Sequence, residues 1–387
     1  MTDAKVRERW RASAFVWIRG DESYHDLQDK RRHLDSTERL ILTSGIDHII
    51  DAEELSLVSG LLPDRLYGLI QGFSSGNWLV SEDADESTLF GIFRVDIETC
   101  RQCNASCKYC PQSARPKQPH VMAEDVFRLI LSEIAPYRPK WVALNHYGEP
   151  LLDPLFRKRC EVLANYQIPL FLFTNATLLC DDTLHFLTKS CLLHGIVFNY
   201  PSIHPSEWAV FMGLQPRLHD RASSAIYTAV RLFSGPIEIL VNGNTECQDR
   251  RLNEVSDLFK EYPHVSVPKW TSHDRAGVHR HLTISPPKNT SELLAGCAHI
   301  VGHMHFSSEG TAFLCCQDYD QSNILGHVRE SSVGQIMTGN IARNLREQIF
   351  GMKAAHDNLI CRSCFELRSH RVLDSDDRLS ISAFPDR

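Results

Sequence analysis

Three cysteines stand close together on one short segment of the chain, Cys103, Cys107 and Cys110, in the order Cys-x3-Cys-x2-Cys. The segment follows a strand-like run at residues 93–97. Iron–sulfur clusters are normally held by four cysteine thiolates. Three thiolates on one loop therefore predict a 4Fe–4S cluster whose fourth iron stays open for a substrate or cofactor.

Zinc and a disulfide framework are the alternative uses of these cysteines. A zinc site usually joins paired cysteine hooks into a tetrahedron, and three cysteines within eight residues make that geometry awkward. A chain of 387 residues with thirteen cysteines is large enough to bury a core without disulfides. An iron–sulfur cluster is therefore the favoured interpretation.

Composition bears on the compartment and on partners. Residues 1–11 are mostly polar and charged, and the sequence has no apolar signal region and no run as long as a membrane span. We therefore expect a cytoplasmic protein with no membrane partner. The formal net charge of −7, from 41 basic and 48 acidic residues, argues against nucleic acid as a partner.

The cysteine loop resembles that of the radical S-adenosylmethionine (SAM) superfamily. Tyr109 adds to the resemblance, because the family usually has an aromatic residue before the third cysteine. In that family SAM chelates the open iron and is cleaved to a 5′-deoxyadenosyl radical. The resemblance implies that Cys103, Cys107 and Cys110 hold the SAM cluster.

The segment Tyr147–Pro150 resembles the Gly-Gly-Glu motif of the same superfamily, with tyrosine in place of the first glycine. By this resemblance Gly148 and Glu149 receive the ammonium group of SAM. Asn199 and Ser202, at the end of the fourth predicted strand and just beyond it, are the expected ligands of other polar groups of SAM. Read alone, each of these residues is as typical of a turn.

Weaker candidates rest on position alone. They lie at or just after the ends of the third, fifth and sixth predicted strands: Thr174–Thr177, Asn242, Asn244 and Trp270. In the family an aromatic side chain at the last of these positions often packs on adenine.

A second set of cysteines lies far from the first: Cys297, Cys315, Cys361 and Cys364. The stretch Phe306–Leu314 predicts a hairpin with a Glu-Gly turn, which would bring the first two cysteines together. The set resembles the Twitch domain, a shortened SPASM domain that holds one auxiliary 4Fe–4S cluster. Cys316 competes with Cys315 as a ligand. A structural zinc site is the alternative, because a terminal Cys-x-x-Cys is also typical of zinc.

The other cysteines and the histidines have no expected role. Five cysteines without partners in sequence suit buried hydrophobic positions: Cys100, Cys160, Cys180, Cys191 and Cys247. The nineteen histidines form no metal pattern that we recognise, and only His146, beside the Glu149 turn, has a position that suggests a pocket.

Strands alternate with helices from Leu89 to about Gly277, which predicts parallel strands with crossover helices. The strands are expected at Phe90–Ile97, Trp141–His146, Leu170–Thr174, Gly195–Tyr200, Pro236–Val241 and Val265–Trp270. Phe127, Ile130, Leu131 and Ile134 mark one face of an amphipathic helix. We expect an α/β fold, a partial (β/α)6 TIM-like barrel whose active site lies at the C-terminal ends of the strands.

The chain is expected to divide into residues 1–86, 87–285, 286–370 and 371–387. The first part reads as a small helical, winged-helix-like module, with helices at Asp35–Thr43, Asp51–Ser59 and Pro63–Gly72 and a strand at Trp78–Val80. An acidic linker at residues 81–87 leads to the barrel. The auxiliary-cluster domain follows, and the charged, serine-rich tail is expected to be loosely docked.

The two implied 4Fe–4S clusters and SAM predict a radical SAM enzyme that oxidatively tailors a peptide or other natural-product intermediate by hydrogen abstraction. A Twitch-type dehydrogenase of a sugar or aminocyclitol alcohol, a redox-neutral epimerase and a glycyl-radical activase are the alternatives. The N-terminal module weakly resembles the leader-binding modules of radical SAM peptide maturases. A flavodoxin or ferredoxin type electron donor is the expected partner. Candidates for the base are unranked: Tyr200, His204, Asp274, Arg275 and Asp318.

Overall fold

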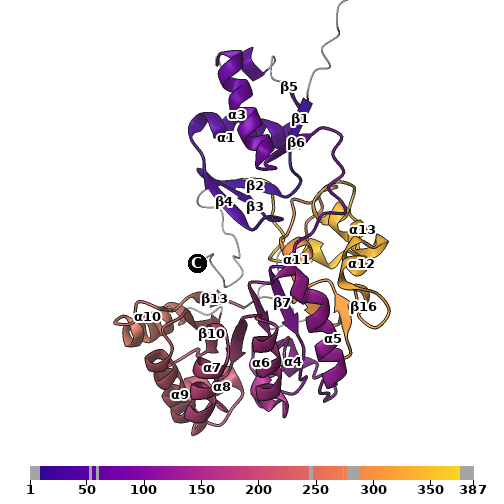
Figure 1. Cartoon of the computed structure of the whole chain (residues 1–387). Coiled ribbons are helices and arrows are strands. Elements are labelled where there is room, and N and C mark those ends of the chain that lie inside the picture. The colour runs from indigo at the N-terminus through magenta and orange to yellow at the C-terminus, as the bar shows by residue number, and fades with distance from the viewer. Residues whose placement is uncertain are drawn as a thin grey trace, which may run out of the picture.

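A ten-stranded sheet runs through both the barrel part and the auxiliary part of the chain (Figure 1). The computed structural model describes residues 9–51, 55–57, 61–243, 247–272, 274–276 and 288–374. The strand order is β12-β11-β10-β9-β8-β7-β14-β15-β16, and β13 pairs with β11 beside β12.

The barrel half of this sheet is parallel throughout. Its strands are β7 (Arg94–Ile97), β8 (Trp141–Ala143), β9 (Leu170–Thr174), β10 (Leu193–Asn199), β11 (Ile237–Gly243), β12 (Val265–Ser266) and β13 (Lys269–Thr271). The connecting helices are α4 (Pro111–Ala114), α5 (Glu124–Ile134), α6 (Phe156–Asn165), α7 (Asp181–Ser190), α8 (Pro205–Met212), α9 (Leu218–Leu232) and α10 (Gln248–Phe259). The predicted parallel α/β architecture is therefore confirmed. The last predicted strand is two short ones, because Pro268 between them has no N–H to donate.

The strands bury both of their faces. Val142, Leu172 and Ile196 pack outward against the helices, including the predicted apolar face of α5. Their chain neighbours Trp141, Phe171 and Val197 belong to a second, smaller cluster. Successive side chains of a strand point to opposite faces, so this second cluster lies on the inner face of the partial barrel. Each such buried side chain stabilises the fold by about 1.5–3 kcal/mol.

The auxiliary segment continues the same sheet. Its elements are α11 (His299–Gly302), β14 (His303–Phe306), β15 (Thr311–Phe313), β16 (Ile324–His327), α12 (Val333–Thr338) and α13 (Asn340–Ile349). Strand β14 is parallel to β7 and antiparallel to β15, with His305 opposite Phe313. Gly310, at a φ of 95°, forms the turn, so the predicted hairpin is confirmed.

The N-terminal module is a mixed unit of helices and two small sheets. Helix α1 (Ser36–Asp47) begins with the predicted cap, in which Asp35 and Glu38 form a capping box, and α3 is Pro63–Ser75. The first sheet joins β5 (Ile50–Asp51), β1 (Arg9–Ala12) and β6 (Leu79–Ser81). The second joins β17 (Val372–Leu373), β2 (Val16–Arg19), β3 (Glu22–His25) and β4 (Lys30–His33). Of the predicted helix at 51–59, residues 52–54, 58 and 59 lie outside the described part.

The strands β1 to β4 and β17 escaped the sequence analysis. They are four residues long or shorter, which is too short for a reliable periodic pattern, and β4 is entirely basic. Strand β17 comes from the predicted tail and pairs in parallel with β2, more than 350 residues away in sequence. Residues 375–387 of that tail lie outside the described part.

The N-terminal module packs on the auxiliary segment through buried contacts. Arg368 Nη2 lies 2.6 Å from Asp26 Oδ2, and both side chains are 6% exposed. The rings of Phe15 and Phe350 meet edge to face with centroids 4.8 Å apart. The module is therefore attached to the auxiliary segment by a buried ion pair as well as by strand pairing.

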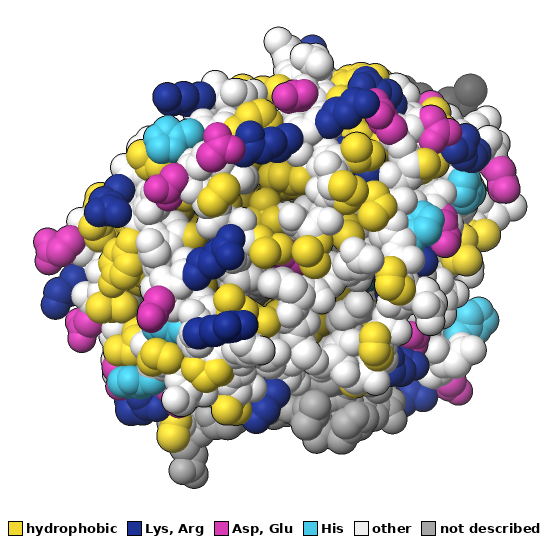
Figure 2. All heavy atoms as spheres, turned by 90° about the horizontal axis from the view of Figure 1, so that it is seen from below, with side chains coloured by type: hydrophobic (Ala, Val, Ile, Leu, Met, Phe, Trp, Pro, Cys, Tyr) yellow, Lys and Arg dark blue, Asp and Glu magenta, His cyan; other side chains and the backbone are white. Residues whose placement is uncertain are grey.

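The outer surface mixes charge and apolar groups. On the face seen from below in Figure 2, acidic and basic side chains are interspersed with hydrophobic ones. Among the helices of the described residues, none combines the length and the apolar character needed to cross a membrane.

The buried ion pair between the module and the auxiliary segment predicts a large loss of stability when it is broken. Arg368→Ala leaves the Asp26 carboxylate buried without its cation, so we expect the free energy of unfolding to fall by about 3–5 kcal/mol. Urea unfolding followed by tryptophan fluorescence measures the loss. The control is Arg343→Ala, because Arg343 pairs with Asp85 at the surface, where the side chains are 42% and 59% exposed, and should cost about 1 kcal/mol or less. Equal losses for both variants would contradict the buried pair's importance.

Candidate functional site

A cavity of about 240 Å³ opens at the C-terminal ends of the barrel strands. Its wall includes all three cysteines of the first set, several of the predicted SAM ligands, and residues of the auxiliary segment: Cys103, Cys107, Cys110, Gly148, Glu149, Asn199, His299, His303, Cys316 and Glu366. The parallel sheet therefore gathers residues from most of its strands at one edge, where ligands of such folds bind.

Two glycines allow the cysteine loop to lie tightly against its neighbours. A Cβ atom on Gly148 would lie 1.9 Å from the carbonyl oxygen of Cys100. Gly213, at a φ of 61°, ends α8, and a Cβ there would lie 2.2 Å from the carbonyl oxygen of Ser106. The Ser106 amide donates to the carbonyl of Met212 over 3.0 Å. The close approach that Gly148 permits is thus to the cysteine loop itself.

The three thiols fit a cluster that supplies positive charge. Burial raises the pKa of Cys107 well above its usual range, and the neighbouring thiolates of Cys110 and Cys103 raise it further. The Ala105 amide donates to Cys103 Sγ over 3.4 Å, which stabilises a thiolate. Buried, mutually repelling thiolates with an N–H donor are the donor set that an iron–sulfur cluster requires.

Glu149 is a buried carboxylate at the wall of this cavity, only 3% exposed. It accepts hydrogen bonds from Thr174 Oγ1 at 2.7 Å, from the Asn175 amide at 2.9 Å and from the Leu151 amide at 3.3 Å. Burial raises its pKa to about 7, against the lowering effect of these bonds. A cation beside the carboxylate would relieve that cost, so the residue suits an ammonium ligand.

The polar strand ends form two networks. Asn175 donates to Asn104 over 2.8 Å and Asn104 donates to Thr177 over 2.8 Å, which ties the end of β9 to the cysteine loop. On the next strands, Asn242 donates to Asn199 over 3.0 Å. Asn175, Asn199 and Asn242 all line the cavity, as does Trp270. Asn244 lies outside the described part of the chain.

Ser202 is not brought to this cavity. Its side chain is fully buried and donates to Glu207 over 2.5 Å, while its hydroxyl accepts from the His204 amide just before α8. The residue acts as a turn before a helix, which is the alternative that its residue type allowed.

Of the five candidates for the base, Arg275 lines the cavity. Tyr200 is bonded to His219 and Ser223, and His204 pairs with Glu254 at 3.3 Å. Asp318 closes its own turn through Ser322 and Asn323. Asp274 is buried but is not part of the cavity wall.

The second cysteine set lines a smaller cavity of about 20 Å³. Its wall contains Cys297, Cys315, Cys361 and Cys364. The Glu366 amide donates to Cys364 Sγ over 3.4 Å. Cys316 instead lines the large cavity. The geometry therefore separates the two neighbouring cysteines.

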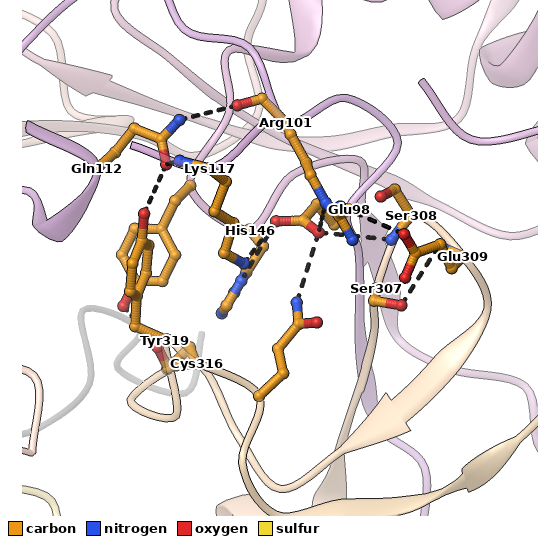
Figure 3. Close-up of polar contacts among 12 residues, drawn as sticks. Glu98, Arg101, Gln112, Lys117, His146, Ser307, Ser308, Glu309, Cys316 and Tyr319 are labelled. Atoms are coloured by element: carbon orange, nitrogen blue, oxygen red, sulfur yellow. Dashed lines mark hydrogen bonds and ion pairs between the residues drawn. The ribbon is translucent and has the colours of Figure 1, made fainter. Parts of the chain in front are cut away.

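A buried carboxylate, Glu98, joins the cysteine loop to the auxiliary segment (Figure 3). It lies 3.1 Å from Arg101 Nε and 3.0 Å from Lys117 Nζ, and it accepts from the Ser308 amide over 3.4 Å. Burial acts to raise the pKa of Glu98, but His146 and Lys117 outweigh it, and the pKa lies well below its usual value. No motif marked Glu98 in the sequence.

The sequence analysis also missed a group of three histidines. Ring nitrogens of His299, His303 and His305 lie within 4.8 Å of one another. The signal was present as the spacing His-x3-His-x-His. Asp96 and Glu366, at the wall of the large cavity, were missed because neither stands in a recognisable motif.

Comparison with known proteins agrees with this arrangement. Residues 297–365 match the SPASM family model, an iron–sulfur cluster-binding domain. No curated protein of similar sequence matches the chain. The fold resembles that of SuiB from Streptococcus suis bound to its precursor peptide SuiA, with a TM-score of 0.56 and 15% identity over 92% of this chain and 93% of that chain.

Two further structures have the fold in part. The enzyme anSMEcpe with bound AdoMet has a TM-score of 0.50 and 16% identity over 71% of this chain and 88% of that chain. BtrN in complex with AdoMet and 2-DOIA has a TM-score of 0.46 and 16% identity over 67% of this chain and 88% of that chain, a likeness too low to support an argument. The likeness to SuiB and anSMEcpe shows that this chain shares their fold, and the family match shows that residues 297–365 form the expected SPASM-like, iron–sulfur cluster-binding domain.

The contact between Gly148 and the cysteine loop predicts that this glycine is required for cluster binding. Gly148→Ala must displace the backbone at Cys100, and we expect a loss of about 1–3 kcal/mol in stability together with less bound iron. Iron analysis after anaerobic reconstitution and the thermal midpoint measure the two effects. Gly72→Ala on α3 is the matched control, because nothing lies within 4 Å of its added Cβ. Wild-type iron content in Gly148→Ala would contradict the prediction.

The burial and charge of Glu149 predict that it binds a cationic group. Glu149→Gln keeps the shape but removes the charge, so we expect SAM affinity to fall by about 1–3 kcal/mol, or roughly 5- to 150-fold. Isothermal titration with SAM measures this fall, and the iron content should not change. Glu161→Gln, on the exposed side of α6, is the control. Unchanged affinity in Glu149→Gln would show that the carboxylate only closes a turn.

Proposed function

We propose that this protein is a radical SAM oxidoreductase that binds two 4Fe–4S clusters and oxidatively modifies a peptide. Cys103, Cys107 and Cys110 hold the cluster that binds SAM, and Gly148, Glu149 and Asn199 bind SAM itself. Cys297, Cys315, Cys361 and Cys364 hold the auxiliary cluster. The single observation that carries the proposal is the presence of two separate cysteine cavities, one three-cysteine and one four-cysteine, in a radical SAM fold.

The clusters supply the redox chemistry when they are bound: the first, with SAM, yields a hydrogen-abstracting radical, and the second accepts one electron. The residues of this chain position the cofactors and the substrate and exclude competing reactions. Glu149 holds an ammonium group at a carboxylate already oriented by Thr174 and Asn175. The Asn104 network keeps the cysteine loop against the end of β9.

A peptide substrate is supported by the extent of the structural similarity. The likeness to SuiB bound to its precursor peptide spans 92% of this chain and therefore includes much of the N-terminal module. The likeness to anSMEcpe covers 71% of this chain. The ion pair of Asp26 and Arg368 attaches the N-terminal module to the auxiliary segment. A module attached there is suited to deliver a segment of the substrate to the large cavity.

Removal of the second cysteine set tests the oxidative part of the proposal. Wild-type protein, reconstituted anaerobically, should contain about eight irons from two cubane clusters, and Cys361→Ser with Cys364→Ser should contain about four. We expect that variant to form 5′-deoxyadenosine from SAM but no oxidised peptide, because the electron has no acceptor. Mass spectrometry of the peptide product and chromatography of 5′-deoxyadenosine measure the two steps.

Two controls make this result interpretable. Circular dichroism establishes that the variant folds, since a metal domain can depend on its metal. Cys180→Ser, an exposed cysteine outside both cavities, should retain eight irons and full product. A normal yield of peptide product from the double variant would show that the second site is structural and the reaction redox-neutral, as in an epimerase.

A further inference from the structure

Three histidines form a compact group beside the large cavity, and one of them, His299, also lines the smaller cavity of the second cysteine set. His299 lies in α11, and His303 and His305 lie in β14. One ring nitrogen of each lies within 4.8 Å of the others. His299 is 8% exposed and His305 is fully buried, so these are interior side chains held in place by the sheet.

The topology explains why they converge. His303 and His305 are two residues apart in a strand and therefore point to the same face. Helix α11 ends at Gly302, directly before β14, and returns His299 over that face with its ring 4.5 Å from that of His303. The parallel pairing with β7 places Asp96 opposite His305. Four potential ligands thus come from two adjacent strands and one helical turn.

Several of their nitrogens have no hydrogen-bond partner. Within the described part of the chain, Nδ1 and Nε2 of His305 and Nδ1 of His299 are buried and make no hydrogen bond. His305 Nδ1 lies 3.1 Å from Asp96 Oδ2 without the geometry of a bond. A buried polar atom left unsatisfied costs about 1–3 kcal/mol, so an arrangement with several of them calls for a missing partner.

We propose that His299, His303 and His305 bind a divalent transition-metal ion of the zinc type, with Asp96 as the nearest carboxylate. Neutral imidazole nitrogens are preferred zinc ligands, and three histidines leave a fourth position open. His299, His303 and Asp96 also line the large cavity, so the open position borders the space proposed for the substrate. An oxygen donor of the substrate is the ligand that suits it.

The charges around the proposed metal ion nearly cancel. Arg94 acts electrostatically on His299 and His303, and its guanidinium packs 5.9 Å from the centre of the Trp141 ring. The Asp96 carboxylate offsets this positive charge. The imidazole donors therefore carry the affinity, and zinc–nitrogen distances of about 2.0–2.1 Å require the rings to move together by a small adjustment.

Metal analysis of the full chain with its clusters in place tests the proposal. Anaerobically reconstituted protein is equilibrated with zinc sulfate and passed over a desalting column, and iron and zinc are then measured. We expect about one zinc per chain in addition to the iron. Zinc K-edge absorption should show a nitrogen and oxygen shell at about 2.0–2.1 Å with imidazole scattering, whereas cysteine ligation gives sulfur at about 2.3 Å.

Variants identify the ligands. His303→Ala and His305→Gln should each lose most of the zinc and keep the iron, and His194→Ala, an exposed histidine on β10, should keep both. Wild-type protein that takes up no zinc, a sulfur shell, or undiminished zinc in both variants would overturn the proposal. If a variant misfolds, the zinc K-edge spectrum of the wild-type protein alone decides whether histidines bind the zinc. The iron content is read separately, so absence of the clusters is distinguishable from absence of this site.

Discussion

The parallel pairing of β14 with β7 is the constraint on which the rest of the site depends. Strand β7 leads into the loop of Cys103, Cys107 and Cys110, and β14 leads through its hairpin to Cys315. Because the two strands run side by side in one sheet, the barrel strands and the auxiliary hairpin form one continuous sheet. The same pairing aligns His305 with Asp96. One backbone register thus relates the strand that leads into the cysteine loop to the strand that carries His303 and His305.

Close packing of backbone against backbone then holds the cysteine loop. Gly148 and Gly213 leave room for the carbonyls of Cys100 and Ser106, and any side chain there would overlap them. Glu98 adds a charged link, since its buried carboxylate contacts Arg101 of the loop and Ser308 of the auxiliary hairpin (Figure 3). A buried carboxylate that lost these partners would be strongly destabilising. The loop and the hairpin are therefore expected to hold one another in place.

Burying the charged and polar side chains of the site costs free energy of folding when no ligand is bound. Burial raises the pKa of Cys107, Cys315 and Glu149, and the nitrogens of His305 lack hydrogen-bond partners among the described residues. Each of these costs falls when a positively charged group binds: a cluster for the thiolates, an ammonium for the carboxylate, a metal ion for the imidazoles. The proposed ligands share this physical logic, and stability should depend on their presence.

The sequence by itself predicted the parallel α/β architecture and identified the two cysteine sets as candidate cluster ligands. Cysteine spacing and the amphipathic face of α5 are local signals, carried by residues within about ten positions of one another. The hairpin turn at Gly310 and the cap at Asp35 were also predictable, because such turns depend on single residue types.

Only the tertiary structure decided what depends on pairing between distant segments. It separated Cys315 from Cys316, placed Ser202 at a helix start rather than in the cavity, and joined β17 to β2. It also revealed that Glu98 connects two parts of the chain and that His299, His303 and His305 converge. Local sequence does not encode these relations, because they arise when strands far apart in the chain enter one sheet and its register selects which side chains meet.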